Sequence, residues 1–139
     1  MDQTEIINYI PQRAPFVMVD EVLQADEHIS KTKFEIRPDN LFVKNGEFIE
    51  PGLVENMAQT AGAGTGYRYQ SKGEVVPVGF IASIKGLEVL SLPKVGDVLE
   101  TSVVITHKVM NVYVVECTVY LNEEKVASCE MKIFEQSEK

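Results

Sequence analysis

Apolar and polar residues alternate along the first third of the chain in a way that predicts a short helix followed by two strands. Residues 4–9 fit the short helix, with Thr4 at its cap. Residues 16–19 are apolar and open the first strand, and residues 29–36 alternate as a half-buried strand does. The turn-forming residues at 38–40 end the second strand.

The middle of the chain predicts one long helix that is buried on most sides. Residues 53–69 carry almost no charge, the exceptions being Glu55 and Arg68, and so apolar a helix has little surface to leave in water. Pro51 fits the first turn, where its missing N–H is not needed. We expect residues 42–50 to form a loop with a turn at its Asn-Gly pair, and the helix to end near Gly73.

The remainder of the chain predicts four successive strands. Residues 78–90, 98–110, 112–121 and 126–134 are rich in β-branched and aromatic residues, and only short breaks separate them. Short links favour an antiparallel sheet. Two strands, one apolar helix and four strands predict an α+β protein, and the simplest way to bury the helix is to wrap the sheet around it. This arrangement is the hotdog fold, and we expect it to form a single domain over residues 1–139.

Composition excludes several classes of protein. The chain has 139 residues, a hydrophobic fraction of 45% and a net charge of −8. A nucleic-acid partner is not expected, because phosphate binding requires clustered lysine and arginine. The start of the chain lacks the pattern of a secretory signal, and its apolar runs are too short to span a membrane, so we expect a cytoplasmic protein.

The two cysteines are expected to be free thiols. Matching the apolar faces of the last two strands pairs Val119 with Cys129 and Cys117 with Met131, which makes the thiols diagonal neighbours. Diagonal positions lie about 7–8 Å apart, beyond the usual reach of a disulfide. The two histidines are far apart in sequence, so neither a metal site nor a cofactor is predicted.

Four segments, in order, resemble the 3-hydroxyacyl-acyl-carrier-protein dehydratases. The segment 10–20 is similar to that family's opening, a Pro-His-Arg-x-Pro stretch leading into an apolar strand that ends in Asp. Residues 50–59 (EPGLVENMAQ) resemble its Pro-Gly…Glu-x-Met-Ala-Gln helix, and residues 79–84 and 92–97 resemble a later strand and its Pro-x-x-Gly-Asp turn. The resemblance covers nearly the whole chain and implies a hotdog fold, assembly into dimers or larger homo-oligomers, and an acyl thioester ligand.

The loop before the helix departs from that family. Where the family has a catalytic histidine in a Gly-His-Phe-Pro-Gly loop, this chain has Glu47, and the stretch from there to Glu55 is shorter. The altered loop resembles a divergent subgroup associated with polyene-pigment pathways. Three sources of the second acid–base group therefore stay open: Glu55 alone, Glu47, or a histidine supplied by a second hotdog dehydratase in a hetero-oligomer.

Glu55 is the main candidate for catalysis. An ordinary interpretation is a carboxylate favoured by the helix dipole, but its apolar neighbours in sequence suggest burial, which requires a hydrogen bond or a raised pKa. The resemblance favours the catalytic role. Gln59 lies one turn further on the same face, and it either orients Glu55 and contacts substrate or satisfies a buried neighbour.

The resemblance adds further candidates for binding. The backbone N–H groups of Gly52 and Leu53 lie at a helix start, where they would stabilise the thioester oxygen. Gly79 is expected to admit a pantetheine arm, and Arg13 to contact it, although a glycine in a strand is as often a bulge. Arg68 and Lys85 are further candidates to hold the phosphate of the carrier.

Three functions remain as hypotheses. The first is dehydration of a 3-hydroxyacyl thioester, carried by acyl-carrier protein (ACP) or coenzyme A, to the trans-2-enoyl thioester, in fatty-acid-like or polyene synthesis. The second is a hotdog thioesterase, in which a helix carboxylate activates water or attacks the thioester. The third is a non-catalytic subunit that pairs with an active dehydratase.

Overall fold

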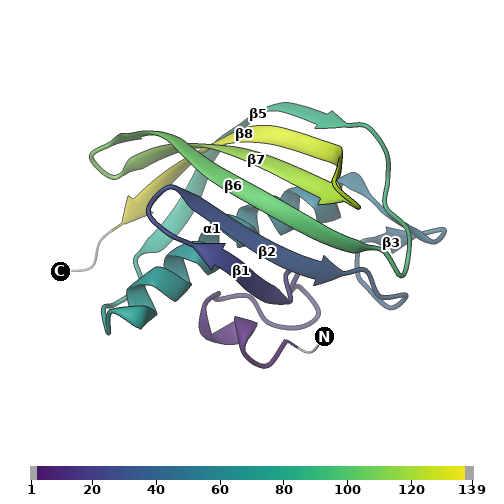
Figure 1. The fold of residues 1–139 in the computed structure, drawn as a ribbon, viewed down its shortest axis with the longest axis horizontal. Coiled ribbons are helices and arrows are strands. Elements are labelled where there is room, and N and C mark those ends of the chain that lie inside the picture. Colours follow the sequence, from purple (N-terminus) through teal and green to yellow (C-terminus); the bar gives the residue numbers. More distant parts are fainter. Residues whose placement is uncertain (1–2, 137–139) are drawn as a thin grey trace.

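A six-stranded antiparallel sheet curls over one long helix in the computed structural model, which describes residues 3–136 (Figure 1). The helix, α1, spans Glu50–Ser71 and crosses the concave face of the sheet. The strands in their spatial order are β1 (Glu21–Ala25), β2 (Ile29–Glu35), β6 (Val98–Val109), β7 (Val112–Leu121), β8 (Glu124–Gln136) and β5 (Val78–Val89). The predicted hotdog arrangement is therefore the observed one.

Two details of the first third differ from the prediction. The expected helix at residues 4–9 is a single 3-10 turn, Ile6–Asn8. The strand expected to open at residues 16–19 instead begins at Glu21. The reason is that the backbone of Phe16 and Met18 hydrogen-bonds to side chains of α1, not to a neighbouring strand.

The expected loop before the helix contains a small hairpin. Strands β3 (Val43–Lys44) and β4 (Glu47–Phe48) pair across a turn at Asn45 and Gly46, both of which have positive φ angles. The Asn-Gly turn was thus predicted, and the two short strands around it were not. The hairpin precedes α1 directly and contributes buried Phe48 to the core.

Helix α1 is held by close packing on both sides. A side chain at Gly64 would collide with Ser30, and one at Gly66 would collide with the backbone of Tyr9. These two glycines allow β2 and the N-terminal segment to approach the helix closely. The main core, which includes buried Leu53 and Met57 of α1, lies between the helix and the sheet. The helix ends before Gly73, as expected.

The predicted register of the last two strands is wrong by two residues. Cys117 lies directly opposite Cys129, and Val119 opposite Ala127. The prediction assumed a four-residue connection, whereas the strands join through a two-residue turn at Asn122 and Glu123, both with positive φ. Both cysteines are free and buried, as expected. A hydrogen bond with Cys129, together with burial, raises the pKa of the Cys117 thiol.

No helix within residues 3–136 is long and apolar enough to cross a membrane. Within the same range, no group of three or more histidine, cysteine, aspartate or glutamate residues is placed to hold a metal ion.

Candidate active site

The centre of the candidate site is a hydrogen-bonded pair on α1. Glu55 and Gln59 lie one helical turn apart, and Gln59 Nε2 donates to Glu55 Oε2 at 3.0 Å. Glu55 is exposed in the single chain, so the burial inferred from its apolar neighbours is wrong. Successive helical residues point about 100° apart, because a turn takes 3.6 residues, so Leu53 and Met57 face the core while Glu55 does not.

Gln59 is fixed in place by the N-terminal segment. Its side chain is 2% exposed. Oε1 accepts a hydrogen bond from the Met18 N–H at 2.7 Å, and Nε2 donates to the Phe16 carbonyl at 2.9 Å as well as to Glu55. Both interpretations of Gln59 thus hold in part: it satisfies buried backbone groups, and with the same amide it orients the Glu55 carboxylate.

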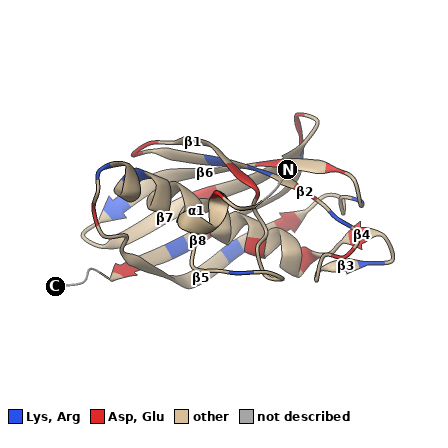
Figure 2. Ribbon diagram, turned by 90° about the horizontal axis from the view of Figure 1, so that it is seen from below, with Lys and Arg blue, Asp and Glu red and all other residues tan. Residues whose placement is uncertain are grey.

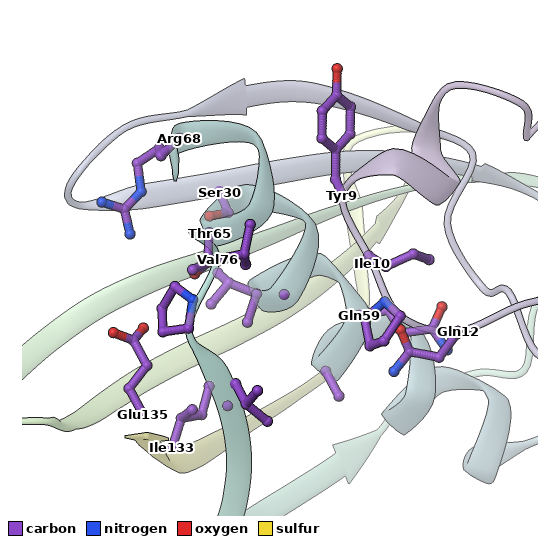
Figure 3. Close-up of a pocket in the computed structure, with 18 of the residues that line it drawn as sticks. Tyr9, Ile10, Gln12, Ser30, Gln59, Thr65, Arg68, Val76, Ile133 and Glu135 are labelled. Carbon is purple, nitrogen blue, oxygen red and sulfur yellow. The ribbon is translucent and has the colours of Figure 1, made fainter. Parts of the chain in front are cut away.

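A large cavity adjoins Gln59 along the helix, and Glu55 is not itself among the lining residues. It has a volume of about 480 Å³ and lies between α1 and the concave face of the sheet, with a wall from the N-terminal segment (Figure 3). The helix contributes small or polar residues to it, and the sheet contributes aliphatic ones. Members from the helix are Ala58, Gln59, Ala61, Gly62, Thr65, Arg68 and Gln70; members from the sheet include Val103, Val115 and Ile133. Gln59 therefore joins the carboxylate to a mostly apolar chamber.

Two predicted binding residues line the same cavity. Gly79 lies in β5 on the cavity wall, and a Cβ there would meet only Ile133, at an ordinary 3.6 Å. Arg13 also lines the cavity, with its guanidinium donating to the Ile10 and Gln12 carbonyls at 2.8 Å. Of the two further cationic candidates, Arg68 lines the cavity, whereas Lys85 is not among the lining residues.

Three other predicted residues are placed less favourably. Glu47 lies in β4, where its backbone pairs with Lys44 and forms an isolated antiparallel β-bridge with Lys94. It is not part of the cavity wall. The N–H groups of Gly52 and Leu53 both point to the Ile49 carbonyl. A thioester oxygen could use these donors only by sharing or breaking those hydrogen bonds.

A buried polar cluster on the opposite side of α1 was missed by the sequence interpretation. Asn56 Nδ2 donates to the Met18 carbonyl at 2.8 Å, and Thr101 donates to Asn56 Oδ1 at 2.5 Å. The Thr60 hydroxyl lies 2.7 Å from the Thr32 hydroxyl. All four side chains are at most 1% exposed. An uncharged polar residue at 56 and another at 60, one turn apart in an apolar helix, were the available signal.

Four charged residues line the cavity, namely Arg13, Asp26, Arg68 and Glu135, and its other lining residues are uncharged. Figure 2 shows α1 almost free of charged residues along its length, and its first turn carries Glu50 while its last carries Arg68. A chamber of this kind suits an uncharged apolar ligand chain with a reactive group near Glu55. Apolar walls with a few placed polar groups are typical of small-molecule sites.

The fold and the pair on α1 define a hotdog-fold protein with a carboxylate on its central helix. Solved structures agree on the fold. The dehydratase heterocomplex ApeI:P from Xenorhabdus doucetiae has a TM-score of 0.86, with 15% identity, over 96% of this chain and 91% of that one. A hypothetical thioesterase from Streptococcus pneumoniae TIGR4, solved with coenzyme A, has a TM-score of 0.69, with 15% identity, over 86% and 87%.

Sequence comparison identifies the family. The model of the ApeP-like family, described as ApeP dehydratase, matches residues 4–139, and the chain therefore belongs to the ApeP-like dehydratases. The 3-hydroxyacyl-[acyl-carrier-protein] dehydratase FabZ of Rickettsia canadensis is 32% identical over 138 residues, covering 91% of this chain and 92% of that protein. The FabZ of Clostridium botulinum strain Hall is 31% identical, covering 76% of each.

Proposed function

We propose that this chain dehydrates 3-hydroxyacyl-ACP to trans-2-enoyl-ACP in fatty-acid-like or polyene synthesis, with Glu55 as its acid–base group. The observation that carries the proposal is the continuous path from the exposed Glu55 carboxylate, through Gln59, into an apolar cavity. The names of the FabZ relatives support the same reaction. In this proposal an acyl chain in the cavity has its thioester end near Gln59, whose amide orients the Glu55 carboxylate.

The reaction requires two proton transfers. A base removes a proton from C2, the C2=C3 double bond forms, and hydroxide leaves C3 as water after taking a proton from an acid. Glu55 can supply either step. The cavity lining of the described chain includes none of Glu55, His28, His107 and Glu47, but the Glu55 carboxylate is hydrogen-bonded to a lining residue, Gln59. We therefore favour a second subunit as the source of the other acid–base group. The ApeI:P dehydratase is likewise a heterocomplex.

Replacing Glu55 tests the proposal directly. Glu55→Gln keeps the shape and the contact with Gln59 but removes the base, and positioned acid–base groups contribute roughly 10²–10⁴-fold to rate. We expect dehydration to fall by that order with the melting temperature unchanged, because Glu55 is exposed. The matched control is Glu116→Gln, at an exposed position on β7. Undiminished enoyl formation in Glu55→Gln would disprove the assignment.

The assay also separates the alternative functions. Hydroxyacyl, enoyl and saturated acyl-ACP are supplied to the purified chain, alone and with a candidate dehydratase partner. Enoyl formation supports the dehydratase, and release of free thiol from the saturated substrate indicates a thioesterase. Activity that appears only with the partner, and persists in Glu55→Gln, indicates a non-catalytic subunit.

The edge strand β5 supports a dimer, either of this chain or with a second hotdog dehydratase. The sheet has edges at β1 and β5. Strand β1 has five residues, whereas β5 has twelve. Long apolar edges attract another strand, so natural proteins cover or pair them. Five large apolar side chains of β5 are 41–50% exposed in the single chain and form an apolar surface that a partner strand can cover. They are Val78, Phe80, Ile81, Ile84 and Leu87.

A charge on this edge tests the assembly. Leu87→Lys is expected to convert the dimer to a monomer by light scattering at micromolar concentration, because it places an ammonium in an apolar interface. Val104→Lys, at an exposed apolar residue on β6 away from that edge, is the control and should stay dimeric. A wild-type protein that is monomeric in the presence and absence of the partner contradicts the proposal.

A further inference from the structure

Two buried side-chain polar atoms in the described chain, residues 3–136, have no hydrogen-bond partner. They are Gln12 Oε1 and Arg68 Nε, and both residues line the cavity. Figure 3 shows Gln12 and Gln59 toward one end of the view and Arg68 toward the other. A buried acceptor without a donor costs free energy, so such atoms in a cavity mark positions where a ligand can supply the missing partner.

The Gln59 amide and the Arg13 guanidinium donate elsewhere, and the unpaired donor Arg68 Nε lies toward the other end of the view in Figure 3. The Gln59 amide is fully used, since Nε2 donates to Glu55 and Phe16 and Oε1 accepts from the Met18 N–H. The Arg13 guanidinium donates to backbone carbonyls, including that of Gln12, and not to the Gln12 side chain. Gln12 Oε1 is thus an unpaired acceptor, and it lies at the same end of the cavity as Gln59, which orients Glu55.

On the basis of the proposed function, we infer that the Gln12 side chain is the hydrogen-bond acceptor for the 3-hydroxyl group of the acyl substrate. The acyl part of a 3-hydroxyacyl thioester has a single hydrogen-bond donor, and this is the 3-hydroxyl. The thioester carbonyl and sulfur only accept, and the amide N–H groups of pantetheine belong to the carrier part of the molecule, beyond the sulfur. The hydroxyl group that donates to Gln12 is attached to C3, the carbon next to C2, from which the base removes a proton.

This contact agrees with the chemistry of the elimination. The hydroxyl donates its own hydrogen to Gln12 and keeps its lone pairs for the proton that converts the departing oxygen to water. Gln12 therefore exchanges no proton and determines which ligand fits. A site that hydrogen-bonds a substrate hydroxyl discriminates against the analogue that lacks it, because the acceptor is then left unpaired.

The test measures binding without turnover. The probes are 3-hydroxyoctanoyl and octanoyl pantetheine amides, in which nitrogen replaces the thioester sulfur and makes the C2 proton much less acidic. Affinity for each is measured by calorimetry with the assembled wild-type protein, Gln12→Leu and Gln12→Met. Gln24→Leu, the same change at an exposed glutamine of β1, is the control.

We expect the wild type and the control to prefer the hydroxy probe by roughly five- to tenfold, the size of one net hydrogen bond. Both Gln12 variants are expected to lose that preference while their melting temperature holds or rises, since an unpaired acceptor is removed. A preference that survives in Gln12→Leu and Gln12→Met, or that is absent from the wild type, overturns the inference.

The failure of the proposed function has a different signature. A wild type that prefers the hydroxy probe but forms no enoyl product, alone or with a partner, retains the Gln12 subsite and loses the dehydratase assignment. A wild type that dehydrates substrate but shows no dependence on Gln12 keeps the dehydratase and loses the subsite. A wild type that binds neither probe overturns both.

Discussion

The two sides of helix α1 treat polar side chains in opposite ways. On one side, which we call the packed side, Asn56 and Thr60 meet Thr32 and Thr101, and each side chain is hydrogen-bonded. On the other, the hollow side of Ala58, Gly62 and Thr65, a cavity leaves Gln12 Oε1 and Arg68 Nε without partners. Satisfied buried polar groups maintain the fold, whereas unsatisfied ones are available to a ligand.

The largest expected effect is loss of the packed-side network. Asn56→Leu keeps the volume but leaves the Met18 carbonyl and the Thr101 hydroxyl without partners. We expect a loss of about 3 kcal/mol in the free energy of unfolding, measured in urea, since each orphaned buried group costs about 1–3 kcal/mol.

A double mutant supplies the control for that experiment. Thr101→Val should cost much less in the Asn56→Leu background than in the wild type, because its partner is already gone. Additive losses would mean that the two side chains do not depend on each other and that the network is only apparent.

Two glycines of α1 provide the second prediction. Gly62 lines the cavity and a Cβ there meets nothing within 4 Å, so Gly62→Leu fills empty space. Binding of the octanoyl probe should weaken at least about tenfold, while stability holds or rises, because glycine in a helix costs roughly 1 kcal/mol against better helix formers. Gly64→Ala, on the packed side, should destabilise the fold by collision with Ser30. Equal effects at the two glycines would contradict the comparison.

The sequence predicted those parts of the fold that depend on local pattern. The apolar helix and the four C-terminal strands were placed within a few residues, because a long periodic segment determines its own structure. The start of β1 was misplaced because the Gln59 and Asn56 side chains take the backbone of residues 16–18, and no local pattern records such a contact. The β7–β8 register failed because the two-residue turn was taken as four.

The candidate site was predicted in part. Glu55 and Gln59 were found through motif resemblance and helical spacing, and they are hydrogen-bonded as that spacing suggests. The exposure of Glu55 was missed because neighbours in sequence were treated as neighbours on the helix surface. Gln12 was missed because its open acceptor becomes visible only when every donor around it has been assigned.

The third prediction concerns the thiols of the core. The raised pKa of Cys117 keeps it neutral in the folded protein, whereas in the unfolded chain it ionises near its ordinary value of 9.0. Stability from this group is complete below pH 9 and falls as the pH rises above it. The hydrogen bond that raises the pKa of Cys117 lowers the pKa of the Cys129 thiol and offsets part of this loss, so the reference protein is the double variant Cys117→Ala/Cys129→Ala. Above pH 9 the wild type should lose more stability than this double variant in urea titrations. The same loss in both proteins would show that the thiol titrates normally.

The smallest expected effect is at Arg68, the hollow-side counterpart of Asn56. Arg68→Met removes a cation in the last turn of α1 and a guanidinium that lies 5.7 Å from the Tyr69 ring, each worth roughly 0.3–1 kcal/mol. It also removes a buried N–H that has no partner, which offsets the loss by about 1–3 kcal/mol. The free energy of unfolding should therefore change by less than about 1 kcal/mol, although Asn56→Leu removes a smaller side chain. A loss at Arg68 as large as that at Asn56 would mean that the hollow side also maintains the fold, and the distinction between the two sides of α1 would not hold.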